Sequence, residues 1–294
     1  MQLEPECIGC LFDQMLRAFK LLSPEISREV IINAQMKLME YLKTLDINKN
    51  ASPNIGKMAY SLVAETLGVD DPYRGLKRKQ NSMILELYDH VKKIVLKSKD
   101  PLFESIIIAA LGNTIDLGAN HKIDIINDIK AFSYNDLVIN DYKDFKASLE
   151  RKNIMLIIGD NAGEIVLDKL LIETLQTEYP KLKIIYSVRS APIINDVTYE
   201  DAEFVNLTRL VQIVEASPTP GIELSTASEE FKSLFFDPHI IILSKGQGNF
   251  ESLYGLDIPS KDVFYLLKAK CSLMEQIFKV VIGNLIFKKR DSDY

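Results

Sequence analysis

The first third of the chain carries apolar residues at helical spacing, and the strict alternation typical of strands is scarce there. Residues 23–25, Ser-Pro-Glu, predict the start of one helix, because a capping residue precedes a proline suited to the first turn. Further helices are predicted at about residues 54–67 and from about residue 71 or 73 to residue 97. The pattern therefore predicts an N-terminal helical bundle domain over residues 1–98.

The pattern changes after residue 98. Residues 102–120 begin as an almost wholly apolar helix and end in glycines and polar side chains, which predicts a buried helix that brings Asn113 and Asp116 to its edge. Short runs of Ile, Val, Leu and Tyr then alternate with helical or loop segments, which is typical of a sheet covered on both faces. The predicted strands are residues 153–159, 182–188, 239–244 and 263–267. Residues 99–294 are thus predicted to form an α/β domain.

Residues 215–230, EASPTPGIELSTASEE, are rich in Ser, Thr, Pro and Glu. This composition predicts a flexible surface loop that could act as a lid.

Composition and charge exclude several classes of protein. The 294 residues are 47% hydrophobic and 26% charged, and no apolar run is long enough to cross a bilayer. The acidic N-terminal segment does not resemble a secretory signal, so a cytoplasmic protein is expected. A net charge of -6 argues against general nucleic-acid binding. We expect no membrane or nucleic-acid partner, and the sequence leaves a homo-oligomer open.

Polar clusters follow three of the predicted strands: GDNAGE, VRSAPIINDVTYEDA and SKGQGNFE. Ligands of open α/β sheets gather at the carboxyl ends of the strands, so the three clusters indicate one site. Asp160, Asn161 and Asp196 supply two carboxylates and an amide carbonyl, which suit Mg²⁺, Mn²⁺ or a related divalent ion. Lys245 and the backbone N–H groups around Gly246 suit an anionic oxygen such as that of a phosphate.

A simpler interpretation exists for the first cluster. Asp160 and Asn161 could merely cap the helix that begins near Ala162, as residues of these types often do. Three such clusters on successive strands favour the site.

These clusters also carry a family resemblance. GDNAGE, NDVTYEDA, KGQGNFE and the upstream GNTIDLG resemble the motifs of the family once called domain of unknown function eighty-nine, now described as metal-dependent damage-control phosphatases. The resemblance extends in order to LLKAKC and covers nearly the whole chain. It implies a helical domain, a Rossmann-like domain with flanking helices, and one divalent metal ion (Mn²⁺, Co²⁺, Ni²⁺ or Mg²⁺).

The resemblance also assigns residues. It implies that Asp160, Asn161 and Asp196 hold the metal, that Lys245 and Gly246 meet the substrate phosphate, and that Asn113 and Asp116 line the pocket. Glu164 and Arg189 are further substrate-binding candidates, although Glu164 could be a first-turn helix acid and Arg189 a surface residue. A glycine expected near residues 189–192 is replaced by Ser190 and Ala191.

Three cysteines are too few for a disulfide scaffold. Cys7 and Cys10 have the spacing of half a zinc site, and together with Cys271 they resemble a subgroup of small, standalone family members. A redox pair, a structural metal site and buried apolar thiols are all compatible with the sequence. His90, His121 and His239 have no partners at motif spacing.

The sequence thus predicts a metal-dependent phosphomonoester hydrolase that acts on small phosphorylated metabolites, such as sugar phosphates or related damaged phosphometabolites. The attacking group is either water or Asp160. One alternative is a carboxyl methyltransferase that uses S-adenosylmethionine, since a strand-to-helix turn with glycines can hold a nucleotide. Another is a regulator that binds a phosphometabolite without turnover, which the missing glycine keeps open.

Overall fold

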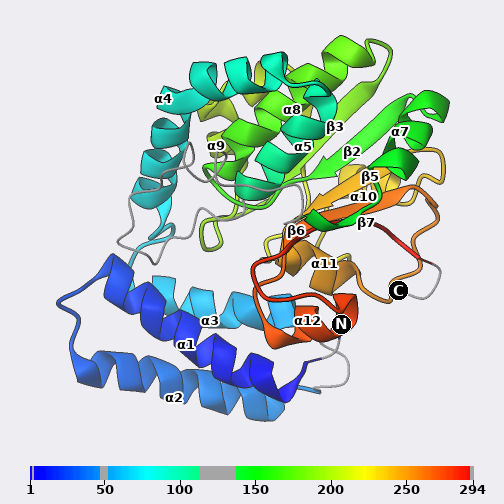
Figure 1. Cartoon of the computed structure of the whole chain (residues 1–294). Coiled ribbons are helices and arrows are strands. Elements are labelled where there is room, and N and C mark those ends of the chain that lie inside the picture. Colours follow the sequence, from blue (N-terminus) through cyan, green and yellow to red (C-terminus); the bar gives the residue numbers. More distant parts are fainter. Residues whose placement is uncertain (2, 47–51, 113–136, 292–294) are drawn as a thin grey trace.

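The protein is described by a computed structural model that covers residues 1, 3–46, 52–112 and 137–291 (Figure 1). In this part of the chain, seven strands form one sheet in the order β1-β7-β6-β5-β2-β3-β4. All neighbouring strands are parallel except β6 and β7. The strands are β1 (Leu137–Asn140), β2 (Ile154–Ile158), β3 (Lys183–Val188), β4 (Gln212–Glu215), β5 (Ile241–Lys245), β6 (Val263–Lys268) and β7 (Leu285–Lys289).

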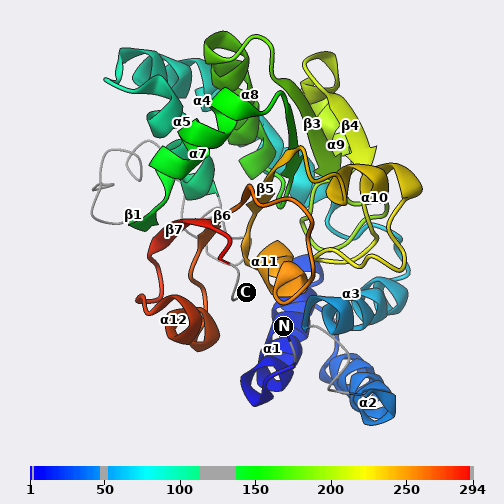
Figure 2. The same ribbon diagram turned by 90° about the vertical axis from the view of Figure 1, so that its right-hand side faces the viewer.

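Helices precede the sheet and cover its two faces (Figures 1 and 2). The first group is α1 (Pro5–Leu22), α2 (Arg28–Thr44), α3 (Ser52–Leu67), α4 (Arg74–Lys97) and α5 (Pro101–Gly112). The second group is α7 (Tyr142–Arg151), α8 (Glu164–Glu178), α9 (Tyr199–Phe204), α10 (Glu229–Phe235), α11 (Gln247–Leu253) and α12 (Ser272–Phe278), with a short 3₁₀ turn at Leu207–Arg209. None of the described helices is long and apolar enough to span a membrane.

The central strands are continuous apolar runs because both of their faces are buried. On one face, α4, α5 and α8 pack in a hydrophobic core with alternate residues of β2 and β5. On the other face, α10, α11 and α12 form a second core with the intervening residues of the same strands. The predicted α/β fold is confirmed: helices lie on both sides of a mostly parallel sheet.

Helices α1, α2 and α3 share a third core and lie as a separate layer beyond the sheet (Figure 1). This layer meets the α/β part where α3 contacts α11. Helix α4 instead packs against α8, and its Ile84, Val91 and Val95 belong to a core of the sheet. The division at residue 98 stays a prediction, but hydrophobic packing groups α4 with the sheet rather than with α1–α3.

The structure corrects one predicted helix start and adds three strands that were not predicted. The helix expected from residue 23 begins at Arg28, because Ser27 is its N-cap and its side chain accepts a hydrogen bond from Val30 N–H. Residues 23–25 instead follow the end of α1. Strands β1, β4 and β7 were not predicted; each is short or partly exposed and lacks a long apolar run.

The loop prediction for residues 215–230 is wrong in part. Ser217, Thr219 and Ile222 are buried, and the Ser217 and Thr219 hydroxyls donate to the Gly221 carbonyl at 3.1 and 2.8 Å. The Ile222 N–H donates to Ser252 Oγ of α11 at 2.8 Å. The composition indicated a surface loop because it cannot reveal hydroxyls that satisfy buried backbone groups.

Asp262, just before β6, gathers several donors. Its carboxylate accepts from Ser148 Oγ at 2.7 Å and pairs with Lys152 Nζ at 2.8 Å and Lys289 Nζ at 3.2 Å. Burial opposes its ionisation, but the hydrogen bonds from Lys152, Ser148 and Lys289 outweigh burial and lower the pKa of Asp262 to about 2. The ionised carboxylate therefore stabilises the fold at neutral pH.

We expect Asp262→Asn to lower the free energy of unfolding at pH 7 by about 2 kcal/mol. Because the folded-state pKa is depressed, this stabilisation exists above the unfolded pKa of about 4 and disappears as pH falls through about 2. Urea unfolding across that range would show the wild-type and variant stabilities converge. Glu229→Gln, in an exposed pair with Lys232, is the control, and we expect a change below about 1 kcal/mol. A constant gap at all pH values would contradict the assignment.

Candidate active site at the carboxyl ends of the strands

The sheet order creates a switch point between β2 and β5. From β2 the chain builds β3 and β4 on one side, and β5 then returns on the other side of β2. Loops that follow the two strands diverge there and leave a crevice, which is where open α/β sheets bind ligands. Asp160 and Asn161 follow β2, and Gly246 follows β5.

A short backbone bridge brings the first two predicted clusters together. Asn161 and Asp196 form an isolated antiparallel bridge. Val197 N–H donates to the Asp160 carbonyl at 2.9 Å, and Ala162 N–H donates to the Asn195 carbonyl at 2.8 Å. Asp160, Asn161 and Asp196 are therefore held side by side although Asp160 and Asp196 lie 36 positions apart in the chain.

Glycines let the backbone approach closely around Asp160. A Cβ on Gly159 would lie 2.4 Å from the hydroxyl oxygen of Tyr186, and a Cβ on Gly246 would lie 1.9 Å from Asp160 Oδ2. Gly246 also has φ 77° and ψ 160°, a conformation that is essentially restricted to glycine. The glycine after β5 thus shapes the space for the Asp160 carboxylate.

The electrostatics of the site favour a cation. Burial, Glu164 and Asp196 raise the pKa of Asp160 to about 7, against opposing effects of Lys270 and Arg189. Burial also raises the pKa of Asp196, although Arg189 Nε donates to Asp196 Oδ2 at 2.6 Å and opposes the shift. Crowded, buried carboxylates of this kind are stabilised in the ionised form by a bound cation.

Arg189 and Asn249 form a buried frame behind the carboxylates. Arg189 Nη2 donates to Asn249 Oδ1 at 2.9 Å, and Asn249 Nδ2 donates to the carbonyls of Gly159 at 3.0 Å and Lys245 at 2.7 Å. Asn249 thereby joins the ends of β2 and β5. The sequence interpretation did not single out Asn249, although its place in KGQGNFE, one helical turn after Lys245, was a usable signal.

Lys245 lies in the core rather than in a cleft. Its Nζ contacts Glu164 Oε1 and Asp168 Oδ1 at 2.5 Å each and donates to the Ala109 carbonyl at 3.2 Å. All three charged side chains are fully buried. Burial opposes the charge on Lys245, but Asp168 and Glu164 outweigh it and raise its pKa. Asp168, one turn after Glu164 on α8, was not predicted.

Helix α4 supports the same turn from outside the sheet. Asn81 Oδ1 accepts from Gly163 N–H at 2.6 Å, and Asn81 Nδ2 donates to Asp201 Oδ1 at 3.1 Å. Lys77 Nζ lies 3.1 Å from Asp201 Oδ2. These buried side chains tie the β2–α8 turn to α9, and the sequence interpretation did not identify them.

A pocket of about 710 Å³ lies over the carboxylates. Asp160, Asn161 and Asp196 form part of its wall, and Lys268 and Lys270 contribute cations from the end of β6. Helices α1 and α3 supply the facing wall, which includes Gln14, Arg17, Gly56 and Tyr60. The N-terminal helices thus complete a pocket whose carboxylates lie in loops that follow the strands.

The remaining predicted residues divide into three groups. Cys7, Cys10 and Cys271 line this pocket. Glu164, Arg189, Lys245 and Gly246 are not among its lining residues; the first three lie buried behind it. Asn113 and Asp116, like His121, lie outside the described residues.

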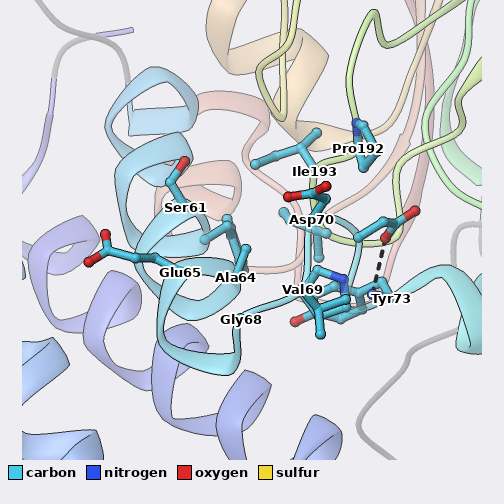
Figure 3. Close-up of a pocket in the computed structure, with 13 residues that line it drawn as sticks. Ser61, Ala64, Glu65, Gly68, Val69, Asp70, Tyr73, Pro192 and Ile193 are labelled. Carbon is cyan, nitrogen blue, oxygen red and sulfur yellow. Dashed lines mark hydrogen bonds between the residues drawn. The ribbon is translucent and has the colours of Figure 1, made fainter.

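A second pocket of about 540 Å³ is lined by residues of α3, of the connection to α4 and of residues 192–194 (Figure 3). Tyr60, Tyr73 and Ile194 line both pockets. Ile194 has φ 45°, a left-handed conformation that costs a β-branched residue about 1–3 kcal/mol. The charged residues of the second pocket are the acids Glu65, Asp70 and Asp71, so it does not suit a phosphate.

The donor set fits a hard divalent ion. No group of three or more His, Cys, Asp or Glu side chains is placed to hold a metal within the described residues. The predicted set is of a different kind, because one of its three ligands is an amide. It combines the carboxylates of Asp160 and Asp196 with the side chain of Asn161, and the backbone bridge holds these residues together. Oxygen donors of this kind suit Mg²⁺ or Mn²⁺, which keep water at further positions.

We expect Gly246→Ala to displace the Asp160 carboxylate and to reduce any activity of this site about a hundredfold, because a misplaced catalytic group has effects of this size. Gly255→Ala is a matched control, since Gly255 also has φ 77° but a Cβ there meets nothing within 4 Å. Both variants should lose about 1–3 kcal/mol of stability from backbone strain. Equal activity in the two variants, measured with thermal melts as a folding control, would contradict the contact.

The fold and the site can be compared with known proteins. The family model of the damage-control phosphatase ARMT1-like domain matches residues 3–286. The chain belongs to this family. The resemblance seen in the sequence motifs is thereby confirmed, and the match spans both the helical layer and the sheet of this damage-control phosphatase family member.

Three relatives of this member of the ARMT1-like family come from archaea. A damage-control phosphatase of Pyrococcus horikoshii is 30% identical over 97% of each chain, and one of Archaeoglobus fulgidus is 28% identical over 98% of this chain and 99% of the other. An uncharacterized protein of Methanocaldococcus jannaschii is 30% identical over 99% of this chain and 96% of its own. The crystal structure of a DUF89 family protein of Pyrococcus horikoshii has a TM-score of 0.88, with 27% identity, and covers 99% of this chain and 100% of its own.

Proposed function

We propose that the protein is a metal-dependent phosphatase that hydrolyses monoesters of small metabolites, such as sugar phosphates or related damaged phosphometabolites. The observation that carries the proposal is the Asn161–Asp196 bridge, which assembles two buried carboxylates and an amide beside a pocket with cations. Membership of the damage-control phosphatase family and the names of the archaeal relatives support the same chemistry.

Asp160, Asn161 and Asp196 would hold one divalent ion: Mn²⁺, Co²⁺, Ni²⁺ or Mg²⁺. When bound, such an ion neutralises phosphoryl oxygens and lowers the barrier to attack at phosphorus. Arg189 and Asn249 orient the ligands from behind, because their hydrogen bonds fix Asp196 and the backbone before Asp160. The attacking group is water or Asp160.

The phosphate is assigned to Lys268 and Lys270 in this proposal. Both line the pocket, and Lys270 is close enough to Asp160 to lower its pKa. Cations opposite a metal site clamp the charged phosphoryl group in the transition state. Lys245 has a structural role here, because Glu164 and Asp168 neutralise it in the core.

The N-terminal helices are assigned to substrate selection. The sequence pattern predicts a helical domain up to residue 98 and a catalytic domain over residues 99–294; because α4 packs with the sheet, the helices assigned to substrate selection are α1 and α3. The helices contribute Gln14, Arg17 and Tyr60 to the wall opposite the metal ligands, where polar groups can bind the hydroxyls of a sugar.

An assay with p-nitrophenyl phosphate tests the proposal, with Mn²⁺, Co²⁺, Ni²⁺ or Mg²⁺ added in turn to metal-depleted protein. We expect metal-dependent release of phosphate, followed by higher rates with a subset of phosphorylated metabolites. Thermal melts with metal and with S-adenosylmethionine separate the methyltransferase alternative, because only a ligand of the folded state raises the melting temperature. Stabilisation by the methyl donor alone, without phosphate release, would overturn the proposal.

A further inference from the structure

All three cysteines of the chain lie at the proposed active site. Cys7 and Cys10 are on α1, Cys271 is the N-cap of α12, and all three are free thiols. They line the same pocket as Asp160 and Asp196. The proposed phosphatase chemistry uses none of these thiols, so it does not explain why they line the pocket.

Cys7 and Cys10 are placed to form a disulfide without a change of fold. They are three residues apart within α1, which puts their Cα atoms about 5 Å apart by helix geometry. Disulfides span Cα separations of about 4.4–6.8 Å. Cys10 is exposed and Cys7 is half-buried, so a small oxidant entering the pocket can reach them.

A chain of hydrogen bonds links Cys10 to the polar wall of the pocket. Gln14 Nε2 donates to Cys10 Sγ at 2.9 Å, and the Tyr60 hydroxyl donates to Gln14 Oε1. Tyr60 is 8% exposed, and burial together with the charges of Tyr73 and Asp196 raises its pKa well above the usual value. A change at the Cys10 sulfur therefore acts on a hydroxyl that lies in the electric field of Asp196.

The thiols are grouped, but not as a metal centre. Partial desolvation by the pocket wall raises the pKa of Cys10, a hydrogen bond from Gln14 opposes the rise, and the charges of Cys7, Cys271 and Glu251 add to it. All three cysteines line one pocket, and Cys7 lies about one helical turn before Cys10 on α1. Yet no three His, Cys, Asp or Glu side chains of the described residues are placed to bind a metal, whereas two thiols suffice for a disulfide.

We propose that Cys7 and Cys10 form a redox-sensitive site that lowers turnover when it is oxidised to a disulfide. The thiolate of one cysteine attacks a small-molecule disulfide, forms a mixed disulfide and releases one small thiol. The other cysteine then attacks the protein sulfur of the mixed disulfide, forms the Cys7–Cys10 bond and releases the second small thiol. Two electrons pass from the protein to the oxidant, and the two thiol protons end on the released thiols.

Oxidation affects the pocket because it turns Cys10 Sγ away from Gln14. The Gln14 amide then loses an acceptor, and the Gln14–Tyr60 contact that shapes the wall is no longer held. We expect turnover to fall about tenfold, which corresponds to about 1.4 kcal/mol, the size of one net hydrogen bond. The effect on turnover rests on the proposed phosphatase function, whereas formation of the disulfide does not.

The test treats the full chain with oxidised glutathione, blocks the remaining thiols with iodoacetamide and measures the intact mass. In parallel, p-nitrophenyl phosphate turnover with Mn²⁺ is measured before and after dithiothreitol. We expect the oxidised wild type to carry one alkylated thiol, which maps to Cys271. Its turnover should be lowered, and dithiothreitol should restore it. Cys271→Ser should show the same internal bridge and the same ratio of reduced to oxidised turnover. Cys7→Ser and Cys10→Ser should form no internal bridge.

Three results would overturn the inference. They are three alkylated thiols after oxidation, a bridge that maps to Cys271, and a Cys7–Cys10 bridge that leaves turnover unchanged. If the reduced protein had no phosphatase activity with any of the metals, the proposed function would be overturned instead. That conclusion would not depend on the number of alkylated thiols.

Discussion

Asp160→Ala is expected to reduce metal-dependent phosphatase turnover about a thousandfold, equivalent to about 4 kcal/mol of transition-state stabilisation. Asp160 lies at the centre of the proposed site. It lies in the turn after β2, contacts the glycine after β5 and is bridged through its backbone to the loop of Asp196. No nearby side chain can replace it, since Asn161 and Asp196 have their own positions at the same site.

The variant should remain folded. Removing a buried carboxylate that is crowded by Glu164 and Asp196 relieves repulsion, so the melting temperature without metal should not fall. The increase in melting temperature caused by Mn²⁺ should disappear, because the ligand set is incomplete. Asp70→Ala, which changes an acid of the second pocket, is the control and should keep both turnover and the metal effect. Full activity in Asp160→Ala would refute the assignment of the centre.

Lys245→Met is expected to destabilise the fold by about 3–5 kcal/mol, the usual effect of removing one partner from a buried ion pair. The side chain is fully buried, and its loss leaves Glu164 and Asp168 together without their cation. Urea unfolding measures the change. Adding Glu164→Gln and Asp168→Asn to the same variant should recover part of the loss, because the uncompensated charges are then removed.

Lys270→Met provides the contrast. Lys270 lies on the pocket wall, so this variant should raise the KM for a phosphate ester and leave stability within about 0.5 kcal/mol. The opposite pattern, a stable Lys245→Met with a raised KM, would show that Lys245 meets the substrate phosphate after all. Stability and KM together thus distinguish a buried structural cation from a phosphate ligand.

The sequence predicted the parts of the fold that depend on long runs. The apolar strands β2, β3, β5 and β6 were recognised because both faces of each are buried, which removes polar residues from the pattern. Their parallel arrangement then placed Asp160, Asn161 and Asp196 at one edge. Strands β1 and β4 have few buried positions and were not recognised.

The direction of single side chains could not be predicted. A lysine followed by glycine at a strand end has the same sequence pattern whether its Nζ points to a ligand or into the core, and Lys245 does the latter. Its partners were visible only as acids one helical turn apart on α8, a spacing that is also common on solvated faces. The frame formed by Arg189 and Asn249 likewise depends on contacts between residues 60 positions apart.

The strand order has a consequence for how the chain folds. β1 pairs with β7, so the first strand of the sheet cannot pair until the last strand, nearly 150 residues later, has been synthesised. While β7 is still within the ribosome, β1 lacks its neighbour and β6 is an open edge strand. Such an edge can pair with strands of other chains. Contacts between residues that are so far apart in the sequence slow folding. The pairing of β2 with β5, beside which the proposed site lies, can form earlier, while the side of the sheet that holds β6, β7 and β1 depends on the final segment.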